Sequence, residues 1–485
     1  MLMNMKMMGR FIAQIIAIEG AFMLPALAIS LGYGEWSAVK AFAVTVGIML
    51  VLAGMLYGLC RKADRLFGAR EGLACVALSW IVMSLLGALP FVLCGQVPHY
   101  IDALFEIVSG FTTTGSSVIA NVEGLYKGIL YWRSFSHWIG GMGVLVFLLA
   151  ILPGGTGSGF TMHLLRAESP GPDVGKLVPK MRQTAVILYV IYIVLTVVNV
   201  IFLLAGGMHW LHALCTAFGT AGTGGFGIFN TSLGNVSPYI QNVTTVFMFL
   251  FGVNFSCYYL LLLGKFRSVL KDEELRLYVG LAVVSVIALV VSIRPLYGTL
   301  EETIRHAAFQ ASSIMTTTGY TTTDYDLWPS FAKGILLLLM IVGASAGSTG
   351  GGLKCIRVLL LFKVLRRNIR QILNPQKVLV VRSNGKAVDE KVLSNVNAYL
   401  AAYVVIVVLS TLILSLDGFS LETNLSAALA TFNNIGPGMA AVGPTCTFAD
   451  YSVLSKLTMI LTMLAGRLEI FPILILFSRS AWRRK

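Results

Sequence analysis

Apolar runs of two lengths alternate along this sequence of 485 residues, and the alternation constrains the fold more than any other feature. The long runs hold about 20 residues, the length that an α-helix needs to cross a lipid bilayer, and the short runs hold about 10 to 12, too few to cross it. Since 56% of the residues are hydrophobic and only 12% are charged, we predict an all-α polytopic membrane protein. We expect about ten transmembrane helices, because a helix satisfies its own backbone inside the bilayer.

Two long runs, roughly 10–33 and 38–60, come first and predict a pair of leading helices. A unit of long helix, short helix, Thr/Gly-rich loop and long helix then occurs four times. The helices of these units are predicted at 70–94, 99–111 and 131–153; 183–206, 209–218 and 238–264; 276–293, 301–315 and 331–364; and 394–416, 422–432 and 451–478. The predicted division is 1–65 for the leading pair and 66–165, 166–270, 271–385 and 386–485 for the units. Such an internal repeat predicts four units packed around a central pore.

The loops that follow the four short helices resemble one another. They read "GFTTTGSS", "AFGTAGTG", "IMTTTGYT" and "TFNNIGPG", and we align them on Gly115, Gly222, Gly319 and Gly436. Small residues also serve to pack membrane helices closely, which is the plain alternative for any one loop. Four copies at matching places in four units favour a shared function instead.

Non-helical backbone at membrane depth is tolerated only where protein buries it or where it lines a water-filled cavity. Glycine permits the backbone angles that turn carbonyl groups inward, and rings of carbonyls can replace the hydration shell of a monovalent cation. The carboxyl ends of the short helices would add a partial negative charge. The predicted ion-binding residues are Thr113, Thr114, Gly115, Thr220, Ala221, Gly222, Thr317, Thr318, Gly319, Asn434, Ile435 and Gly436. No carboxylate lies among them, which argues against a site selective for divalent cations.

The last helix of the third unit, "LLLLMIVGASAGSTGGGLKCIRVLLLF", is interrupted by glycines. Each glycine costs a helix about 1 kcal/mol relative to alanine. We predict a flexible intramembrane gate loop at 343–352, just beneath the ring, with a simple helix kink as the alternative. Its glycines are Gly343, Gly347, Gly350, Gly351 and Gly352. A phosphate-binding loop is disfavoured, because Lys354 follows a leucine and no strand precedes the segment.

The segment "LTMLAGRLEIFPILILF" places Arg467 and Glu469 inside the last long helix. A charge at the bilayer centre costs at least about 2.5 kcal/mol and normally faces a cavity or a partner. Arg467 is therefore predicted to lie under the ring as an electrostatic barrier to cations. A structural ion pair, or a side chain extending to the cytoplasmic interface, is the alternative.

The formal charge of +14 is distributed unevenly, and its placement indicates the topology. Most of the 36 Lys and Arg residues fall at the amino end and at 61–70, 166–182, 265–276, 354–391 and 479–485. By the positive-inside rule these segments and both termini are predicted to be cytoplasmic, which disfavours nucleic acid as a partner. The opposite side carries acidic residues that would concentrate cations at an outer mouth. These include Asp102, Glu106, Glu301, Glu302, Asp324 and Asp326.

Neither a cofactor nor a catalytic centre is indicated by the sequence. The seven cysteines are scattered among apolar neighbours, and the six histidines lack metal-binding spacing. Ser312 and His306 lie near each other, but no orienting acid accompanies them. We therefore predict a transporter without a cofactor, not an enzyme, whose only bound metal is a monovalent cation at the predicted filter residues.

Taken together, the motifs "FTTTGSS", "GTAGTGG", "MTTTGYTTTD", "FNNIGPG", "GASAGSTGGGLK" and "LAGRLEIFPIL" resemble the TrkH branch of the Trk/Ktr/HKT potassium-transporter superfamily. The resemblance spans nearly the whole chain. It implies inward K⁺ transport across the bacterial inner membrane and a homodimer with one pore in each protomer. It also implies a TrkA-like cytosolic ring that binds nucleotides and NAD and regulates the gate, and it assigns gate roles to 343–352 and Arg467.

Two questions stay open at this point. The basic stretch "KVLRRNIRQILNPQKVLVVRSNGKAVDEK" is a candidate docking surface for the cytosolic partner, or else a solvated segment beside anionic lipid. The transport mechanism is either a channel-like pore or a symporter coupled to Na⁺ or H⁺, since broken helices suit both. For symport, the acids near the bilayer to test are Glu19, Glu106 and Glu469.

Overall fold

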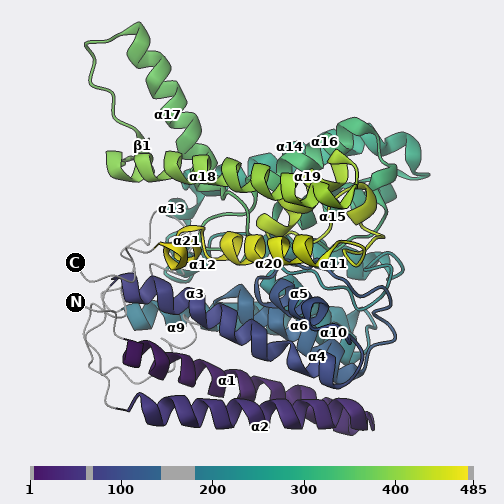
Figure 1. The fold of residues 1–485 in the computed structure, drawn as a ribbon. Coiled ribbons are helices and arrows are strands. Elements are labelled where there is room, and N and C mark those ends of the chain that lie inside the picture. The colour runs from purple at the N-terminus through teal and green to yellow at the C-terminus, as the bar shows by residue number, and fades with distance from the viewer. Residues whose placement is uncertain (1–4, 62–68, 144–180, 479–485) are drawn as a thin grey trace.

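Figure 1 shows the computed structural model, which describes residues 5–61, 69–143 and 181–478. The two leading helices, α1 (Met5–Gly32) and α2 (Trp36–Leu59), lie side by side at one edge of the molecule. Through its other side α1 packs on α3 (Ala69–Gly87) and α6 (Lys127–Gly141). The leading pair therefore sits outside the helices that carry the loops.

Four short helices, each preceded by a long one, form the interior. The short helices are α5 (Tyr100–Phe111), α10 (Trp210–Gly222), α15 (Leu300–Met315) and α19 (Leu421–Phe432). The preceding helices are α3 with its short continuation α4 (Leu89–Leu93), α9 (Met181–Ala205), α14 (Glu273–Ile293) and α18 (Glu390–Leu414). Several starts have ordinary N-caps, such as Thr299 before α15 and Ser420 before α19, whose side chains accept a backbone N–H.

The helices that follow the loops are shorter than expected. They are α6, α11 (Pro238–Phe251), α16 (Ser330–Val342) and α20 (Val453–Arg467). Three are followed, after a break, by α12 (Phe255–Leu262), α17 (Cys355–Leu373) and α21 (Phe471–Phe477). The pair α11–α12 bends by 88°. The remainder of the predicted helix 131–153 lies largely outside the described residues.

Within the described ranges, six helices are long and apolar enough to cross a membrane, or seven if α11 and α12 count as one span. The expectation of about ten transmembrane helices is therefore not confirmed by this count. The physical reason is that the helices predicted at 238–264, 331–364 and 451–478 are broken by polar and glycine-containing segments. At 469–470 even Glu469 and Ile470 take left-handed backbone angles.

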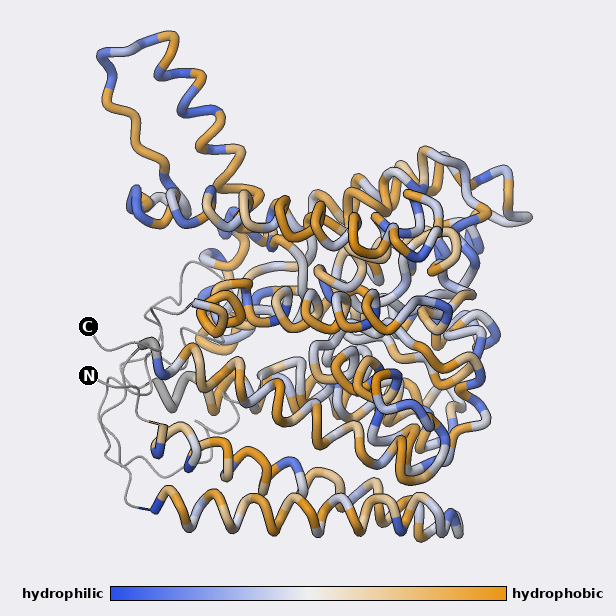
Figure 2. The backbone as a smooth tube through the Cα atoms, in the orientation of Figure 1, coloured by the Kyte–Doolittle hydropathy of each residue, from blue (hydrophilic) through white to orange (hydrophobic). Residues whose placement is uncertain are grey.

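Hydrophobic residues follow the long helices, and hydrophilic residues concentrate in the segments that join their ends (Figure 2). Large apolar side chains on these helices face outward, for example Val51, Val291 and Leu338, each more than half exposed. Such a surface suits lipid rather than water. The protein is thus a helical, multi-pass membrane protein.

The remaining elements are small. They are α13 (Phe266–Leu270), the 3₁₀ turns η1 (Arg294–Leu296), η2 (Tyr325–Leu327), η3 (Ser415–Asp417) and η4 (Ala440–Val442), and the strands β1 (Arg382–Ser383) and β2 (Lys386–Ala387). The strands pair as a hairpin around Asn384 and Gly385, a sequence suited to a two-residue turn. The distal part of α17 extends away from the body of the molecule, whereas the hairpin lies back near the start of α18 (Figure 1).

Candidate ion pathway

Each of the four short helices ends in the same backbone geometry. A residue with left-handed φ comes first: Thr113 at 55°, Thr223 at 55°, Thr317 at 58° and Asn434 at 55°. The next residue donates its backbone N–H to the carbonyl five residues earlier, over 2.8–2.9 Å in all four loops. A glycine with positive φ follows: Gly115 at 83°, Gly225 at 69°, Gly319 at 85° and Gly436 at 106°. We name residues 113–115, 223–225, 317–319 and 434–436 loops 1 to 4.

This geometry corrects the predicted second loop. Thr220, Ala221 and Gly222 lie in the last turn of α10, and Thr223, Gly224 and Gly225 occupy the positions that match loops 1, 3 and 4. Gly222 instead allows α10 to pack against the backbone of α6, where an added methyl group would strike the carbonyl of His137. The predicted residues of loops 1, 3 and 4 lie where the alignment placed them.

The four glycines close a ring. A methyl group added at Gly115 would lie closer than 3.0 Å to the carbonyl oxygen of Gly224 in loop 2. The same holds from loop 2 to loop 3, from loop 3 to loop 4, and from loop 4 back to loop 1. The corresponding pairs are Gly225 with Thr318, Gly319 with Ile435, and Gly436 with Thr114. Each loop therefore touches the next through a glycine and a carbonyl, and backbone groups line the centre.

Apart from that of Thr113, the side-chain hydroxyls in the loops are bonded within the protein. The Oγ1 atoms of Thr112 and Thr114 lie 2.8 Å apart, and those of Thr316 and Thr318 repeat this pair at the same distance. In loop 4 the amide of Asn434 donates to Thr114 Oγ1 over 2.9 Å and so links loops 4 and 1. Thr113 Oγ1 and Asn434 Oδ1 have no hydrogen-bond partner among the described residues.

Left-handed backbone is costly for a β-branched residue, by about 1–3 kcal/mol. Three of the four loops nevertheless place threonine there: Thr113, Thr223 and Thr317. Such strain persists only where surrounding structure imposes it, and it is concentrated at functional sites. The repeated strain thus makes the ring the candidate functional centre.

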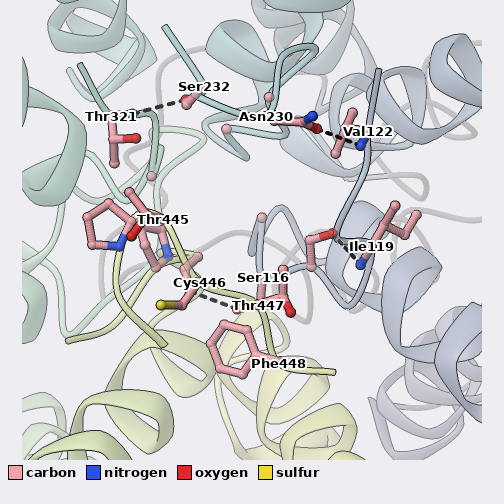
Figure 3. Close-up of a pocket in the computed structure, with 18 of the residues that line it drawn as sticks. Ser116, Ile119, Val122, Asn230, Ser232, Thr321, Thr445, Cys446, Thr447 and Phe448 are labelled. Carbon is pink, nitrogen blue, oxygen red and sulfur yellow. Dashed lines mark hydrogen bonds between the residues drawn. The ribbon is translucent and has the colours of Figure 1, made fainter. Parts of the chain in front are cut away.

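A cavity of about 120 Å³ opens on one side of the ring. Its lining includes the glycines of all four loops and the segments that follow them. Figure 3 shows Ser116, Asn230, Thr321 and Phe448, one from the segment after each loop, around this space. Hydrogen bonds join neighbouring segments, as from the Val122 N–H to Asn230 Oδ1 over 2.8 Å. The cavity is therefore a vestibule built by all four units.

Several of the acidic residues predicted at the outer mouth are neutralised by ion pairs. Asp102, Glu106 and Glu301 form ion pairs with Lys456, Arg133 and Arg305. Burial is the main cause that raises the pKa of the Asp326 carboxyl above its usual range. The acidic side therefore attracts cations less strongly than a count of its carboxylates implies.

The predicted gate loop lies on the opposite side of the ring. Between α16 and α17 the chain is non-helical, and Gly343, Gly347 and Gly352 have φ of 72°, 67° and 79°. Gly351 donates its N–H to Thr317 Oγ1 over 2.6 Å, and a methyl group on Gly350 would lie 2.8 Å from the Thr316 carbonyl. The loop thus packs directly beneath loop 3.

Gly351 also packs against loop 4, since an added methyl group would strike the carbonyl of Asn433. The loop is held from outside as well, because Ser345 N–H bonds the Gly252 carbonyl over 3.1 Å and Phe255 N–H bonds the Gly347 carbonyl over 3.0 Å. Both partners lie at the break between α11 and α12. The gate loop therefore fills the space under half of the ring.

Arg467, at the end of α20, connects the gate loop to α6. It donates to the carbonyl oxygens of Thr349 over 2.8 Å and Gly141 over 2.7 Å, and also to that of Gly140. Glu469 forms its ion pair with Arg357 of α17. Arg467 thus places a positive charge among carbonyls just below the ring.

Two buried charged residues next to the gate loop were not singled out from the sequence. Glu274 Oε1 accepts the Ala346 N–H over 2.6 Å and the Ile356 N–H over 3.2 Å, which ties the first part of the loop to the start of α17. Lys354, 3% exposed and with φ of 74°, donates to the Gly350 carbonyl. An acid directly after a basic loop resembles ordinary surface charge, so only burial reveals its role.

Among the described residues no group of three or more His, Cys, Asp or Glu side chains could hold a metal ion. Of the acids considered for symport, Glu106 and Glu469 are in ion pairs. Glu19 is fully buried, and neither of its carboxyl oxygens has a hydrogen-bond partner among the described residues. None of these three acids lies in loops 1 to 4.

Comparison with known proteins gives a consistent result. The family model TrkH, described as "Cation transport protein", matches residues 38–483. The Trk system potassium uptake protein TrkH of Escherichia coli strain K12 is 35% identical over 477 residues, covering 97% of each chain. That of Halomonas elongata is 33% identical over 493 residues, covering 99% of this chain and 100% of the relative.

A solved structure, the crystal structure of the potassium transporter TrkH from Vibrio parahaemolyticus, is also similar. It matches with a TM-score of 0.89 and 31% sequence identity, over 99% of this chain and 100% of the other. These matches agree with the prediction of a transporter rather than an enzyme. On the strength of the family match and of the relatives covered almost end to end, this chain belongs to the TrkH family of cation transport proteins.

Proposed function

We propose that this protein takes up K⁺ through a selective, channel-like pore whose filter is formed by loops 1 to 4. The observation that carries the proposal is the closed ring, in which each loop's glycine meets a carbonyl of the next loop. Rings of carbonyls can replace the hydration shell of K⁺. The relatives named above are potassium uptake proteins, which agrees with this cargo. The filter residues are Thr113, Thr114, Gly115, Thr223, Gly224, Gly225, Thr317, Thr318, Gly319, Asn434, Ile435 and Gly436.

The gate loop at 343–352 and Arg467 are proposed to close the pathway on the side away from the vestibule. The loop packs under loops 3 and 4, and Arg467 bridges it to α6. A cation leaving the ring would meet a guanidinium group, and like charges repel strongly where water is excluded. Opening would then require the loop and Arg467 to move together.

The cytoplasmic side is proposed to be the side of the gate loop, with both termini there, in the bacterial inner membrane. We propose a homodimer regulated by a TrkA-like ring that docks on α17 and the β1–β2 hairpin. One chain of contacts could carry its signal inward. Asn384 of the hairpin bonds Glu273 N–H over 2.9 Å and Asp272 Oδ2 over 2.8 Å at the start of α14, where the next residue, Glu274, holds the gate loop.

Symport with H⁺ is the second candidate, and Glu19 is the observation that favours it. Acidic residues inside membrane helices can form proton relays, and Glu19 is buried in α1 without a hydrogen-bond partner among the described residues. However, Glu19 lies on α1, against Gly87 and Phe111, not in the ring. A channel-like pore therefore remains the leading function.

Uptake of rubidium-86 into proteoliposomes of the purified chain tests the proposal. No Na⁺ or H⁺ gradient is imposed, and K⁺ or Na⁺ is added as competitor. Downhill uptake that K⁺ blocks and Na⁺ does not is the expected result. Uptake only with an imposed Na⁺ or H⁺ gradient would establish symport instead, and uptake blocked equally by both ions would refute the proposed selectivity.

A further inference from the structure

The residue directly after each ring glycine reaches toward the preceding unit. These four residues are Ser116, Phe226, Tyr320 and Pro437. Ser116 Oγ donates to the Gly436 carbonyl over 2.8 Å, which ties loop 1 to loop 4. The Tyr320 hydroxyl donates to the Thr216 carbonyl of α10 over 3.1 Å. Pro437 packs against Gly319 and so joins loop 4 to loop 3. Three of the four contacts between neighbouring units are thus made by neutral groups.

The contact between the units of loops 1 and 2 differs, because it includes charged side chains. The Phe226 ring lies between two side chains of α6: the Arg133 guanidinium is 3.6 Å from its centroid, and the His137 ring is stacked on it at 4.1 Å with an interplanar angle of 19°. Arg133 also donates to the carbonyl of Gly227, the next residue, over 3.0 Å. One charged side chain therefore holds two successive residues after Gly225.

Arg133 connects these residues to loop 1 through Glu106 of α5. Its Nε lies 2.6 Å from Glu106 Oε1. The same carboxylate accepts the Val118 N–H over 3.0 Å and the Ser117 hydroxyl over 3.0 and 3.1 Å. The segment after loop 1 and the segment after loop 2 are therefore bonded to one ion pair, directly behind the ring.

Stability alone explains this arrangement poorly. Glu106 is 0% exposed and Arg133 2% exposed, and burying such a pair contributes little net stability compared with apolar residues of the same volume. What a bonded ion pair supplies is fixed geometry, because both groups must keep their partners. The size of a backbone ring and the field of its carbonyls are the two properties to which K⁺/Na⁺ selectivity is attributed, and both depend on where the carbonyls lie.

We propose that Arg133, with Phe226 and Glu106, forms a positioning element that fixes the spacing of loops 1 and 2 and thereby determines the preference of the ring for K⁺ over Na⁺. The inference rests on the proposed function and adds specificity-determining residues to it. None of the three acts as a ligand. They act through the carbonyls of loops 1 and 2.

The test is the K⁺-to-Na⁺ permeability ratio of the purified full-length protein in proteoliposomes. Arg133→Gln removes the guanidinium, and Phe226→Leu removes its aromatic partner without changing any charge. Each is expected to lower the ratio about tenfold while the maximal K⁺ flux is retained. Phe226→Tyr keeps the aromatic face and is expected to have the permeability ratio of the wild type. A purely structural role would lower the amount of active protein but leave the ratio unchanged.

Lys456→Gln is the matched control, because it breaks another ion pair to the same helix, that with Asp102 at 2.6 Å. Its ratio should equal that of the wild type. A wild-type ratio in folded Phe226→Leu would overturn the inference, even if Arg133→Gln does not fold. An equal loss in Lys456→Gln would overturn it as well. If the wild-type protein itself shows no preference for K⁺, the proposed function fails instead, so the two failures are distinguishable.

Discussion

Replacing Gly436 by alanine is the sharpest test of the ring, because its contact is the mildest of the four. An added methyl group would lie 2.9 Å from the Thr114 carbonyl oxygen, whereas ordinary van der Waals contact begins at 3.4 Å. The φ of 106° adds strain for any residue with a Cβ. Loops 4 and 1 must therefore move apart slightly, on the scale by which K⁺ and Na⁺ differ in size.

We expect Gly436→Ala to fold and to conduct K⁺, with a K⁺-to-Na⁺ permeability ratio lowered about tenfold, equivalent to about 1.4 kcal/mol of differential binding. The assay is bi-ionic flux in proteoliposomes, with folding checked by thermal unfolding of the detergent-solubilised protein. Gly225→Ala is the more severe substitution of the two, because its methyl group would meet a closer carbonyl. Its methyl group would fall on the Thr318 carbonyl itself, so we expect selective transport to be lost altogether.

Gly334→Ala in α16 is the control, because nothing lies within 4 Å of the added group and no positive φ is required. It should transport as the wild type does and gain up to about 1 kcal/mol of helix stability. A wild-type ratio in folded Gly436→Ala would refute the reasoning that backbone carbonyls at this ring select the ion. Full selective transport in Gly225→Ala would refute the corrected placement of loop 2.

Arg467→Ala should raise basal K⁺ flux about tenfold, because it removes charge-assisted hydrogen bonds that hold the gate loop and contribute roughly 1.5–3 kcal/mol each. Unchanged flux in folded protein would mean that Arg467 has a structural role only. Glu274→Ala leaves the Ala346 N–H without its acceptor, at a cost of about 1–3 kcal/mol, and should speed hydrogen exchange in the gate loop. Exchange no faster than in the wild type would mean that the carboxylate does not anchor the loop. Glu19→Gln should leave downhill rubidium flux unchanged, whereas loss of a dependence on the pH gradient would establish proton coupling at this residue.

The helical membrane architecture followed from the apolar pattern, but the second loop did not. Its sequence offers two Thr-x-Gly triplets in succession, Thr220-Ala221-Gly222 and Thr223-Gly224-Gly225. Either could be aligned with the other loops by composition. The choice is made by tertiary packing, because Gly222 lets α10 run one turn further against the backbone of α6. No local signal in the loop contains that contact.

Of the broken helices, too, only some could be predicted from the sequence. The glycines at 343–352 indicated one break. At the break after α20 the nearby glycine, Gly466, is still helical, and the residues with positive φ are Glu469 and Ile470. The ion pair of Glu469 with Arg357 comes from residues more than a hundred positions apart and so could not be read locally. Sequence therefore predicts a break where the backbone is intrinsically flexible, and not where packing imposes one.

The partners of Arg467 bear on how a gate of this kind could open. Thr349 belongs to the third unit, Gly140 and Gly141 to the first, and Arg467 itself to the fourth. One side chain thus bridges three units, so a shift of any of them disturbs the same set of bonds. These acceptors are neutral carbonyls, and a bond from a cation to a carbonyl costs less to exchange for water than a buried ion pair. Glu469, by contrast, is fixed to Arg357 in such a pair. In the function proposed above, this bridge would hold the loop under the ring at rest. A regulator that displaced α17 or α14 would need only a few kcal/mol of binding energy to release it.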